Sequence, residues 1–259
     1  MIDIHCHLLP GVDDGAHDLD HSIEMARAAV ASGVEAIVAT PHVSRTYMTA
    51  PASLAQRVAE VQQALDGADV PLRVHVGAEI AQSMLADLDD DALRACALGG
   101  GRYILLEPPY TGPAPFIDRM VDDLEQRGFG VVLAHPERIG AFHRNLSLLE
   151  KLVDQGALCS VTSMSAAGEF GGQVKKFTAE LFRRGLVHNL ASDAHDADHR
   201  SPGMKPVLKK AVENFPGLEE WLAWMTDEVP RAILGGEAVD TTDSPRLESR
   251  RGLFRRMRR

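Results

Sequence analysis

Nine side chains that could bind a metal ion occur along the sequence, each close to the end of a short apolar segment. Five are imidazoles and four are carboxylates: His5, His7, Asp14, His42, Glu79, Glu107, His135, Asp193 and His195. Ile104–Leu106 leads directly into Glu107, and a buried carboxylate is costly unless it is paired or binds a metal. Imidazole and carboxylate ligands without thiolate suit Mn²⁺, Fe²⁺ or Zn²⁺, and one ion cannot use nine of them. The sequence therefore predicts a polynuclear metal site.

The segments that precede these side chains are short, apolar and partly β-branched, as buried parallel strands are. A parallel α/β barrel places the carboxyl ends of its strands on one rim, where functional residues gather. All the predicted strands except the sixth lead into His, Asp or Glu, so side chains far apart in the sequence would meet there. The predicted strands are Ile2–His5, Val34–Thr40, Leu72–Gly77, Tyr103–Leu106, Gly130–Ala134, Leu158–Thr162 and Val187–Ala191.

Amphipathic patterns typical of helices fill the intervals between the strands, with roughly 25–35 residues in each strand–helix unit. Several patterns stop at a glycine, which is a common residue just after a helix. The sequence therefore predicts a single-domain α/β fold, a distorted barrel with one unit fewer than the eight-fold form. The predicted helices are Asp18–Ser32, Pro51–Asp66, Pro113–Arg127, Asn145–Gln155 and Glu169–Arg184, followed by two or three outer helices within Pro202–Gly236.

Two arginines, Arg138 and Arg200, follow predicted ligands at short spacing. A guanidinium group matches phosphate oxygens bidentately. Polynuclear metal sites activate water and stabilise in-line displacement at phosphorus. Either arginine could instead form a surface ion pair, with Glu137 or Asp198 respectively. The combination of ligands and arginines favours hydrolysis of a phosphate ester.

The composition is typical of a soluble globular protein, with 259 residues, 45% hydrophobic and 25% charged. No apolar run is long enough to span a bilayer, and the amino terminus lacks the pattern of a signal peptide. Three widely spaced cysteines, Cys6, Cys96 and Cys159, do not make a disulfide framework. We therefore expect a cytoplasmic, reduced protein.

The net charge of −10 is unevenly distributed. Residues 246–259 contain seven Arg and one Glu, so this segment carries +6 and the rest of the chain −16. An acidic body argues against nucleic-acid binding, which needs a basic surface. The Arg-rich tail is predicted to be a flexible, solubilising terminus. The alternative is weak contact with an anionic membrane surface, which its arginines and interleaved apolar residues would allow.

Taken together, the motifs resemble the PHP (polymerase and histidinol phosphatase) superfamily. More narrowly, they resemble its bacterial metal-dependent tyrosine-protein phosphatases of capsular and exopolysaccharide synthesis. The resemblance runs in order from residue 3 to about residue 237. Its motifs are DIHCHLLPGVDDGA from Asp3, ATPH ending at His42, VGAEI around Glu79, ILLEPPY around Glu107, HPERIGAF from His135, SVTSMSAAGEFG from Ser160, SDAHDADHRSPGM from Ser192, and EVPRAILGGE.

The resemblance implies a PHP barrel over residues 1–240, a tail over 241–259 and three divalent ions, with Mn²⁺ preferred and Fe²⁺, Co²⁺ or Zn²⁺ as alternatives. It also implies that Arg138 and Arg200 clamp the phosphate. Either Asp13 or Asp14 could be the ligand that the DDGA motif supplies. The implied ligand sets are His5, His7, Glu79 and Asp193 for one ion, Glu79, Glu107 and His135 for the second, and Asp14, His42 and His195 for the third.

The substrate implied by the resemblance is phosphotyrosine on a tyrosine autokinase that regulates polysaccharide synthesis. The main alternative is a histidinol-phosphatase-like enzyme that acts on a small phosphate ester. An amidohydrolase or a binding module that shields phosphotyrosine without hydrolysis would use similar ligands. Cys96 and Arg102 match the Cys-x5-Arg spacing of cysteine-dependent phosphatases, but a helical stretch precedes Cys96 and the predicted strand from Tyr103 follows Arg102. That order is reversed, so we expect Cys96 to have no catalytic role.

Overall fold

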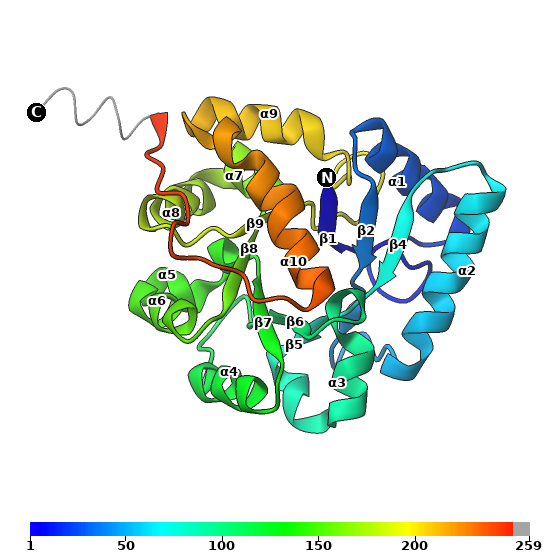
Figure 1. Ribbon diagram of the computed structural model, residues 1–259, viewed down its shortest axis with the longest axis horizontal. Helices are drawn as coiled ribbons and strands as arrows, with labels where there is room; N and C mark the ends of the chain where they lie inside the picture. The colour runs from blue at the N-terminus through cyan, green and yellow to red at the C-terminus, as the bar shows by residue number, and fades with distance from the viewer. Residues whose placement is uncertain (251–259) are drawn as a thin grey trace, which may run out of the picture.

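The computed structural model describes residues 1–250 and contains parallel strands surrounded by helices (Figure 1). All the strand pairs are parallel, as buried strands with apolar residues on both faces require. The strands are β1 Ile2–Cys6, β2 Ala36–Ala39, β3 His42–Val43, β4 Arg73–Val76, β5 Glu79–Ala81, β6 Tyr103–Glu107, β7 Gly130–Ala134, β8 Leu158–Thr162 and β9 Asn189–Ala191.

The strands form two sheets, of order β1-β2-β4 and β3-β5-β6-β7-β8-β9. The predicted parallel α/β architecture is confirmed, with one correction: the second and third predicted strands each continue in a second piece. Pro41 separates β2 from β3, because proline cannot donate a ladder hydrogen bond. Gly77 lies between β4 and β5, where a Cβ would stand 2.5 Å from Val38 Cγ1. Counting each broken strand once gives the seven predicted strand positions.

The first and last strands approach each other and connect the two sheets. The Asp193 N–H donates to the His5 carbonyl at 2.9 Å, and the His7 N–H donates to the Ala194 carbonyl at 2.9 Å. An isolated parallel bridge joins Cys6 and Ala194. The carboxyl ends of β1 and β9 therefore lie side by side.

Helices cover the outside of the strands and include those predicted, whereas the short helices Gly140–Arg144 and Ser163–Ala167 were not predicted. Asp18 accepts a hydrogen bond from the His21 N–H and so caps the first helix. The helix predicted from Pro113 begins only at Ile117, because prolines at 113 and 115 fix the preceding loop. The helices are α1 Leu19–Ala31, α2 Leu54–Gly67, α3 Asp90–Cys96, α4 Ile117–Gln126, α5 Gly140–Arg144, α6 Leu146–Asp154, α7 Ser163–Ala167, α8 Gly171–Arg184, α9 Met204–Asn214 and α10 Val229–Gly235, with shorter turns that include η2 Gln82–Asp87.

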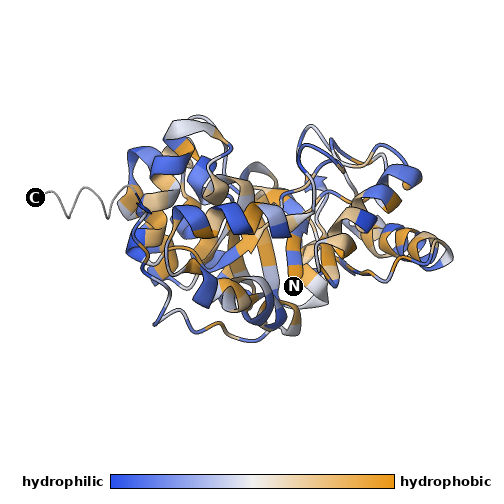
Figure 2. Ribbon diagram, turned by 90° about the horizontal axis from the view of Figure 1, so that it is seen from above, coloured by the Kyte–Doolittle hydropathy of each residue, from blue (hydrophilic) through white to orange (hydrophobic). Residues whose placement is uncertain are grey.

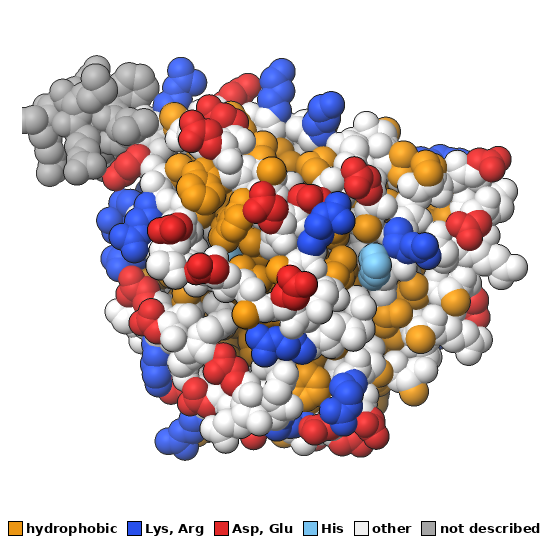
Figure 3. All heavy atoms as spheres, in the orientation of Figure 1, with side chains coloured by type: hydrophobic (Ala, Val, Ile, Leu, Met, Phe, Trp, Pro, Cys, Tyr) orange, Lys and Arg blue, Asp and Glu red, His pale blue; other side chains and the backbone are white. Residues whose placement is uncertain are grey.

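Apolar side chains fill the space between strands and helices, and hydropathy is highest along the central strands (Figure 2). A second apolar cluster lies inside the ring that the strands form, and it includes Ile4, Leu105 and Val132. Helix α10 covers this cluster with Val229 and Ile233. The face that α10 crosses carries interspersed acidic and basic side chains (Figure 3). The core therefore fixes the strand ends on the opposite side, where the predicted ligands lie.

The segment after residue 240 leaves the body along α8. The Leu247 N–H donates to the Phe182 carbonyl at 3.1 Å, and Pro245 is buried. Residues 251–259 of the predicted tail lie outside the described residues, so the division into a body and a tail stays a prediction. Within residues 1–250, no helix has the length and apolar character needed to cross a membrane.

Candidate metal centre

All nine predicted ligands meet at the carboxyl ends of the strands. The nine residues fall into four overlapping groups. Each residue of a group offers one possible ligand atom, and these atoms all lie within 4.8 Å of one another. The overlap of the groups makes them one continuous cluster instead of separate sites. The groups are His7, Asp14, His42 and His195; His5, His7 and Asp193; His5, Glu79 and His135; and His42, Glu79 and Glu107.

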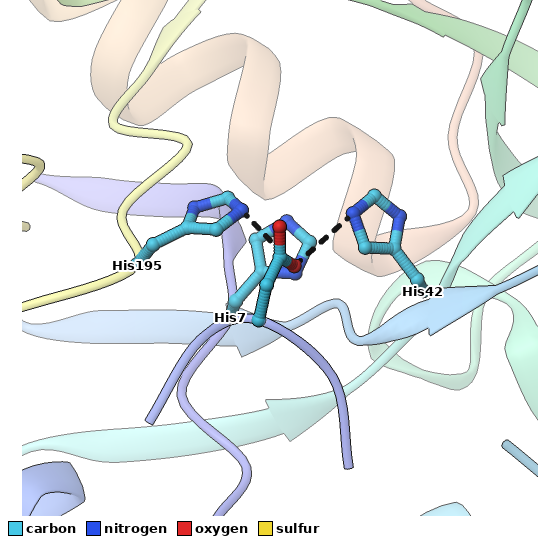
Figure 4. A group of neighbouring side chains, drawn as sticks. His7, His42 and His195 are labelled. Carbon is cyan, nitrogen blue, oxygen red and sulfur yellow. Dashed lines mark ion pairs between the residues drawn. The ribbon is translucent and has the colours of Figure 1, made fainter. Parts of the chain in front are cut away.

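One group comes from the loops that follow β1 and β9 and from the first residue of β3. His7, His42 and His195 turn their rings toward a common point (Figure 4). Asp14 Oδ1 lies 3.5 Å from Nε2 of both His42 and His195. These ion pairs lower the pKa of Asp14, with His195 as the main cause. The group offers imidazole nitrogens around a carboxylate oxygen, a donor set that suits a divalent transition metal.

Glu79, at the start of β5, is the centre of the cluster and is fully buried. Its Oε2 lies 3.3 Å from His5 Nε2, and its Oε1 lies 2.9 Å from His135 Nε2. Burial opposes ionisation of Glu79, but His5 and His135 lower its pKa well below the ordinary value. Oε2 still has no hydrogen-bond partner among the described residues, although it is buried. A buried carboxylate oxygen in that position is suited to a cation.

Glu107, at the end of β6, lies 3.6 Å from His135 Nε2 and 3.9 Å from His42 Nδ1. Burial, and then repulsion by Glu79 and Asp193, raise the pKa of Glu107 to about 9. The site thus concentrates negative charge that the imidazoles alone do not neutralise. This excess of carboxylates fits the binding of divalent cations at the site.

The structure distinguishes the two acids of the DDGA motif. Asp13 Oδ2 lies 2.8 Å from His7 Nδ1 and accepts the His42 N–H at 2.9 Å, so Asp13 faces the outer side of a ligand ring. Asp14 joins the imidazole group, which favours Asp14 as the ligand. Gly15 is required beside them, since a Cβ there would lie 2.2 Å from the His7 carbonyl oxygen. Asp13 therefore orients His7, a role that carboxylates commonly have at metal sites.

Arg138 and Arg200 both point at Asp193. Arg138 Nη1 forms a very short ion pair with Asp193 Oδ2, and Arg200 Nη2 lies 2.7 Å from the same oxygen. The other oxygen, Oδ1, lies 3.4 Å from His5 Nε2. Asp193 thus connects the imidazole cluster to a pair of guanidinium groups. The Arg138 guanidinium also lies between two rings, 5.1 Å from the Tyr110 centroid and 4.8 Å from that of Phe170.

Two further buried acids, Asp3 and Glu137, support the site although neither is a predicted ligand. Asp3 accepts hydrogen bonds from the N–H and the hydroxyl of Ser192, next to a predicted ligand. Glu137 Oε1 accepts the Ser165 hydroxyl at 2.7 Å and the Thr162 N–H at 3.1 Å, which ties the turn after β7 to the start of α7. An acid inside a predicted apolar strand was the available signal for Asp3. For Glu137 the sequence indicates only a surface ion pair with Arg138, whereas its hydrogen bonds are to Ser165 and Thr162.

The Cys-x5-Arg segment does not form an anion site. Cys96 ends α3 and Arg102 directly precedes β6, which confirms the reversed order. Cys96 is fully buried, and burial raises the pKa of its thiol to about 12. A buried neutral thiol is not a nucleophile.

The ring of parallel strands and the cluster on its rim define a parallel α/β protein with a candidate polynuclear metal centre. The model of the family described as "Capsular polysaccharide synthesis, CpsB/CapC" matches residues 1–217, and the chain belongs to this family.

Several named proteins are similar to this chain over nearly their whole length. The tyrosine-protein phosphatase YwqE of Bacillus subtilis is 38% identical over 98% of this chain and 99% of its own. A putative tyrosine-protein phosphatase CapC of Staphylococcus aureus is 30% identical over 86% of this chain and 88% of its own. A solved structure from a study of YwqE and CpsB, described as unique metal-dependent tyrosine phosphatases, matches with a TM-score of 0.82 and 36% identity, over 93% of this chain and 96% of that chain.

Proposed function

We propose that this protein is a metal-dependent protein-tyrosine phosphatase that hydrolyses phosphotyrosine on a protein. The observation that carries the proposal is the buried cluster of imidazoles and carboxylates that shares Asp193 with two arginines. The similarity to YwqE over nearly the full chain supports it. A metal-dependent phosphoric monoester hydrolase needs both features, because it must activate water and bind a dianionic group.

Three divalent ions would fit the ligand sets, with Mn²⁺ preferred. Each set contains at least one imidazole nitrogen and one carboxylate oxygen, and Glu79 can serve two ions because its oxygens face different histidines. The four overlapping groups support such sharing. The sets are His5, His7, Glu79 and Asp193; Glu79, Glu107 and His135; and Asp14, His42 and His195.

The mechanism is direct hydrolysis without a phosphoenzyme. Divalent ions at the cluster would activate water and neutralise the charge that develops during in-line displacement at phosphorus. Arg138 and Arg200 place two guanidinium groups beside the cluster, where they can bind the phosphoryl oxygens bidentately. The leaving tyrosinate, with an ordinary pKa of about 10, needs little protonation. The residues therefore supply orientation and positive charge, as phosphoryl transfer requires.

The proposed partner is a tyrosine autokinase that regulates capsule or exopolysaccharide synthesis. The family to which the chain belongs is described by capsular polysaccharide synthesis, and this description supports a role in that process. The proposed location is the cytoplasm, where the Arg-rich tail could contact the inner face of the plasma membrane. Binding to vesicles with and without anionic lipid, compared between the full chain and a chain that ends at residue 250, tests that contact.

The decisive assay is hydrolysis of a phosphotyrosyl peptide by the purified protein. We expect chelation to abolish activity, Mn²⁺ to restore it and Cys96→Ser to leave it unchanged. His135→Ala should remove activity while the fold is retained in circular dichroism. Activity that resists chelation would contradict the proposal. Hydrolysis of histidinol phosphate, but not of the peptide, would favour the small-ester alternative.

A further inference from the structure

Exposed apolar side chains gather beside the metal centre. Residues 1–250 contain four exposed large hydrophobic side chains, and three of them lie in loops that follow β3 and β6: Met48, Tyr110 and Phe116, with 83%, 41% and 64% exposure. Tyr47, next to Met48, stacks on His42 with ring centroids 5.5 Å apart. We call Tyr47, Met48, Tyr110 and Phe116 the apolar lip. Exposed apolar side chains grouped in this way indicate an interaction site.

Contacts with the turn between them hold the two loops of the lip together. Arg45 forms a 2.8 Å ion pair with Asp87 at the end of η2. Gln82, at the start of η2, donates to the Pro115 carbonyl at 2.8 Å. Since η2 directly follows β5, which pairs with both β3 and β6, the loops are neighbours on one side of the rim.

The other end of the second loop reaches the metal cluster itself. The Tyr110 ring stacks on His135 at 5.1 Å, and its hydroxyl lies 3.2 Å from His135 Nε2. The Gly140 N–H donates to the Tyr110 carbonyl at 3.1 Å, which ties the loop to α5. The lip therefore extends from His42 to His135, across the side of the cluster formed by β3, β5 and β6.

The second loop also has a restricted backbone. It contains four prolines, at positions 108, 109, 113 and 115, and proline restricts the backbone. Phe116 has a φ of 58°, a left-handed conformation that is rare for an aromatic residue, and its ring lies 5.5 Å from the Arg119 guanidinium. Such conformations persist where the surroundings enforce them, commonly at functional sites. The backbone that carries the exposed ring is therefore restricted, which lowers the entropy cost of ordering this loop on binding.

The two sides of the cluster differ in chemistry. Arg138 and Arg200 bring positive charge from the loops after β7 and β9, whereas the lip brings rings and a thioether from the loops after β3 and β6. Tyr110 lies where the two sides meet, because its ring centroid is 5.1 Å from the Arg138 guanidinium. A ligand whose phosphate lies at the arginines can therefore place its ring against Tyr110 and extend its remaining atoms over the rest of the lip.

We propose that the lip binds the apolar part of a phosphotyrosyl peptide: Tyr47 and Tyr110 contact the phenyl ring, and Met48 and Phe116 contact an apolar side chain next to the phosphotyrosine. The proposal rests on the proposed phosphatase function and adds a sequence preference to it. A pair of packed aromatic rings contributes binding free energy beyond that of its buried area. Methionine is flexible and so adapts to varied apolar partners.

The test compares the Mn²⁺-supplemented full chain with the double variant Met48→Ser/Phe116→Asn, in which asparagine tolerates the left-handed backbone. Three substrates are used: a phosphotyrosyl peptide with apolar flanking residues, the same peptide with serine flanks, and p-nitrophenyl phosphate. Leu19→Ser is the matched control, because Leu19 is the fourth exposed apolar residue, at 39%, and lies outside the lip.

We expect the double variant to raise KM for the apolar peptide roughly tenfold, the scale of one buried apolar side chain, with kcat nearly unchanged. KM for the serine-flanked peptide and for p-nitrophenyl phosphate should change less than twofold, and Leu19→Ser should match the parent chain. If the parent chain hydrolyses both peptides with equal KM, the lip proposal is overturned while the phosphatase function stands. If no substrate is hydrolysed with Mn²⁺ present, the proposed function fails and the lip proposal fails with it.

Discussion

Asp13→Asn tests whether the first acid of the DDGA motif orients a metal ligand without binding the metal. The Asp13 side chain is fully buried and has three close polar contacts: Oδ2 faces His7 Nδ1 at 2.8 Å and the His42 N–H at 2.9 Å, while Oδ1 accepts the Gly15 N–H at 3.0 Å. Asparagine has nearly the same shape but only one acceptor oxygen. In either orientation its NH₂ group must face at least one N–H group.

The size of the effect follows from these contacts. Leaving a buried donor without an acceptor costs about 1–3 kcal/mol, so the free energy of unfolding of the metal-free protein should fall by that amount. Burial lowers the pKa of His7, but its hydrogen bond with Asp13 is the main cause of a net rise. The variant therefore also changes the basicity of a proposed ligand. Loss of such an orienting carboxylate weakens metal affinity about 10–100-fold.

Two measurements check the prediction. Urea unfolding in the presence of chelator gives the stability change, and activity against a Mn²⁺ concentration series gives the apparent metal affinity. We expect Asp13→Asn to need about 10–100-fold more Mn²⁺ but to regain most activity at saturation. Asp14→Asn is the matched control: Asp14 is 47% exposed and is proposed to bind metal directly, so this variant should lose less stability than Asp13→Asn yet stay poorly active at high Mn²⁺. An Asp13→Asn protein with unchanged Mn²⁺ dependence would refute the orienting role.

Three further outcomes are expected. Arg138→Lys should lower kcat/KM for a phosphotyrosyl peptide about tenfold or more, because lysine cannot bind bidentately; an unchanged value would remove Arg138 from phosphate binding. Mn²⁺ should raise the midpoint of thermal unfolding of the parent chain but not of Glu79→Gln, because metal binding to the folded state stabilises it; equal shifts would contradict the central position of Glu79. Burial lowers the pKa of His188 to about 4, so the unfolded chain binds this proton first and stability is lost as pH falls from 6.5 toward 4. With chelator present, the parent chain should lose about 2 kcal/mol more than His188→Gln between about pH 7 and pH 5, and equal losses would contradict this assignment.

The strand ends were predictable because each combined two opposed signals. The apolar run Ile104–Leu106 predicts a buried strand, and Glu107 follows it directly. Because a buried carboxylate needs a partner, Glu107 is predicted to have a cation or a cationic group next to it. The order of such segments was enough to predict a ring of parallel strands. At Pro41 and Gly77 a strand ends in one sheet and continues in the other, and this was not predicted. The sequence shows only that the apolar segment before each of these residues has ended. The short strands β3 and β5 depend on pairing with each other, which is a tertiary contact.

The contacts around the proposed ligands were less predictable for a different reason. Asp13 and Asp14 are adjacent and chemically alike, and only the path of the loop over His7 separates their roles. The aromatic residues of the lip lie in loops without periodicity, so no pattern distinguishes them from ordinary surface residues. Their placement depends on η2 and α5, which contact these loops from either side.

Backbone strain at the proposed metal centre connects the stability of the fold to its proposed chemistry. Among the described residues, four non-glycine residues have a positive φ, and two of them, His135 at 33° and Asp193 at 52°, are proposed ligands. Each such conformation costs about 1–3 kcal/mol. Neighbouring strands hold both residues: the His135 N–H donates to the Ser160 carbonyl at 2.8 Å, and the Asp193 N–H to the His5 carbonyl at 2.9 Å. A strand that simply continued would alternate its side chains between core and exterior, whereas the left-handed turn directs these two toward the cluster. The ladder hydrogen bonds of β1 and β8 thus maintain a ligand geometry that the local sequence alone would not adopt.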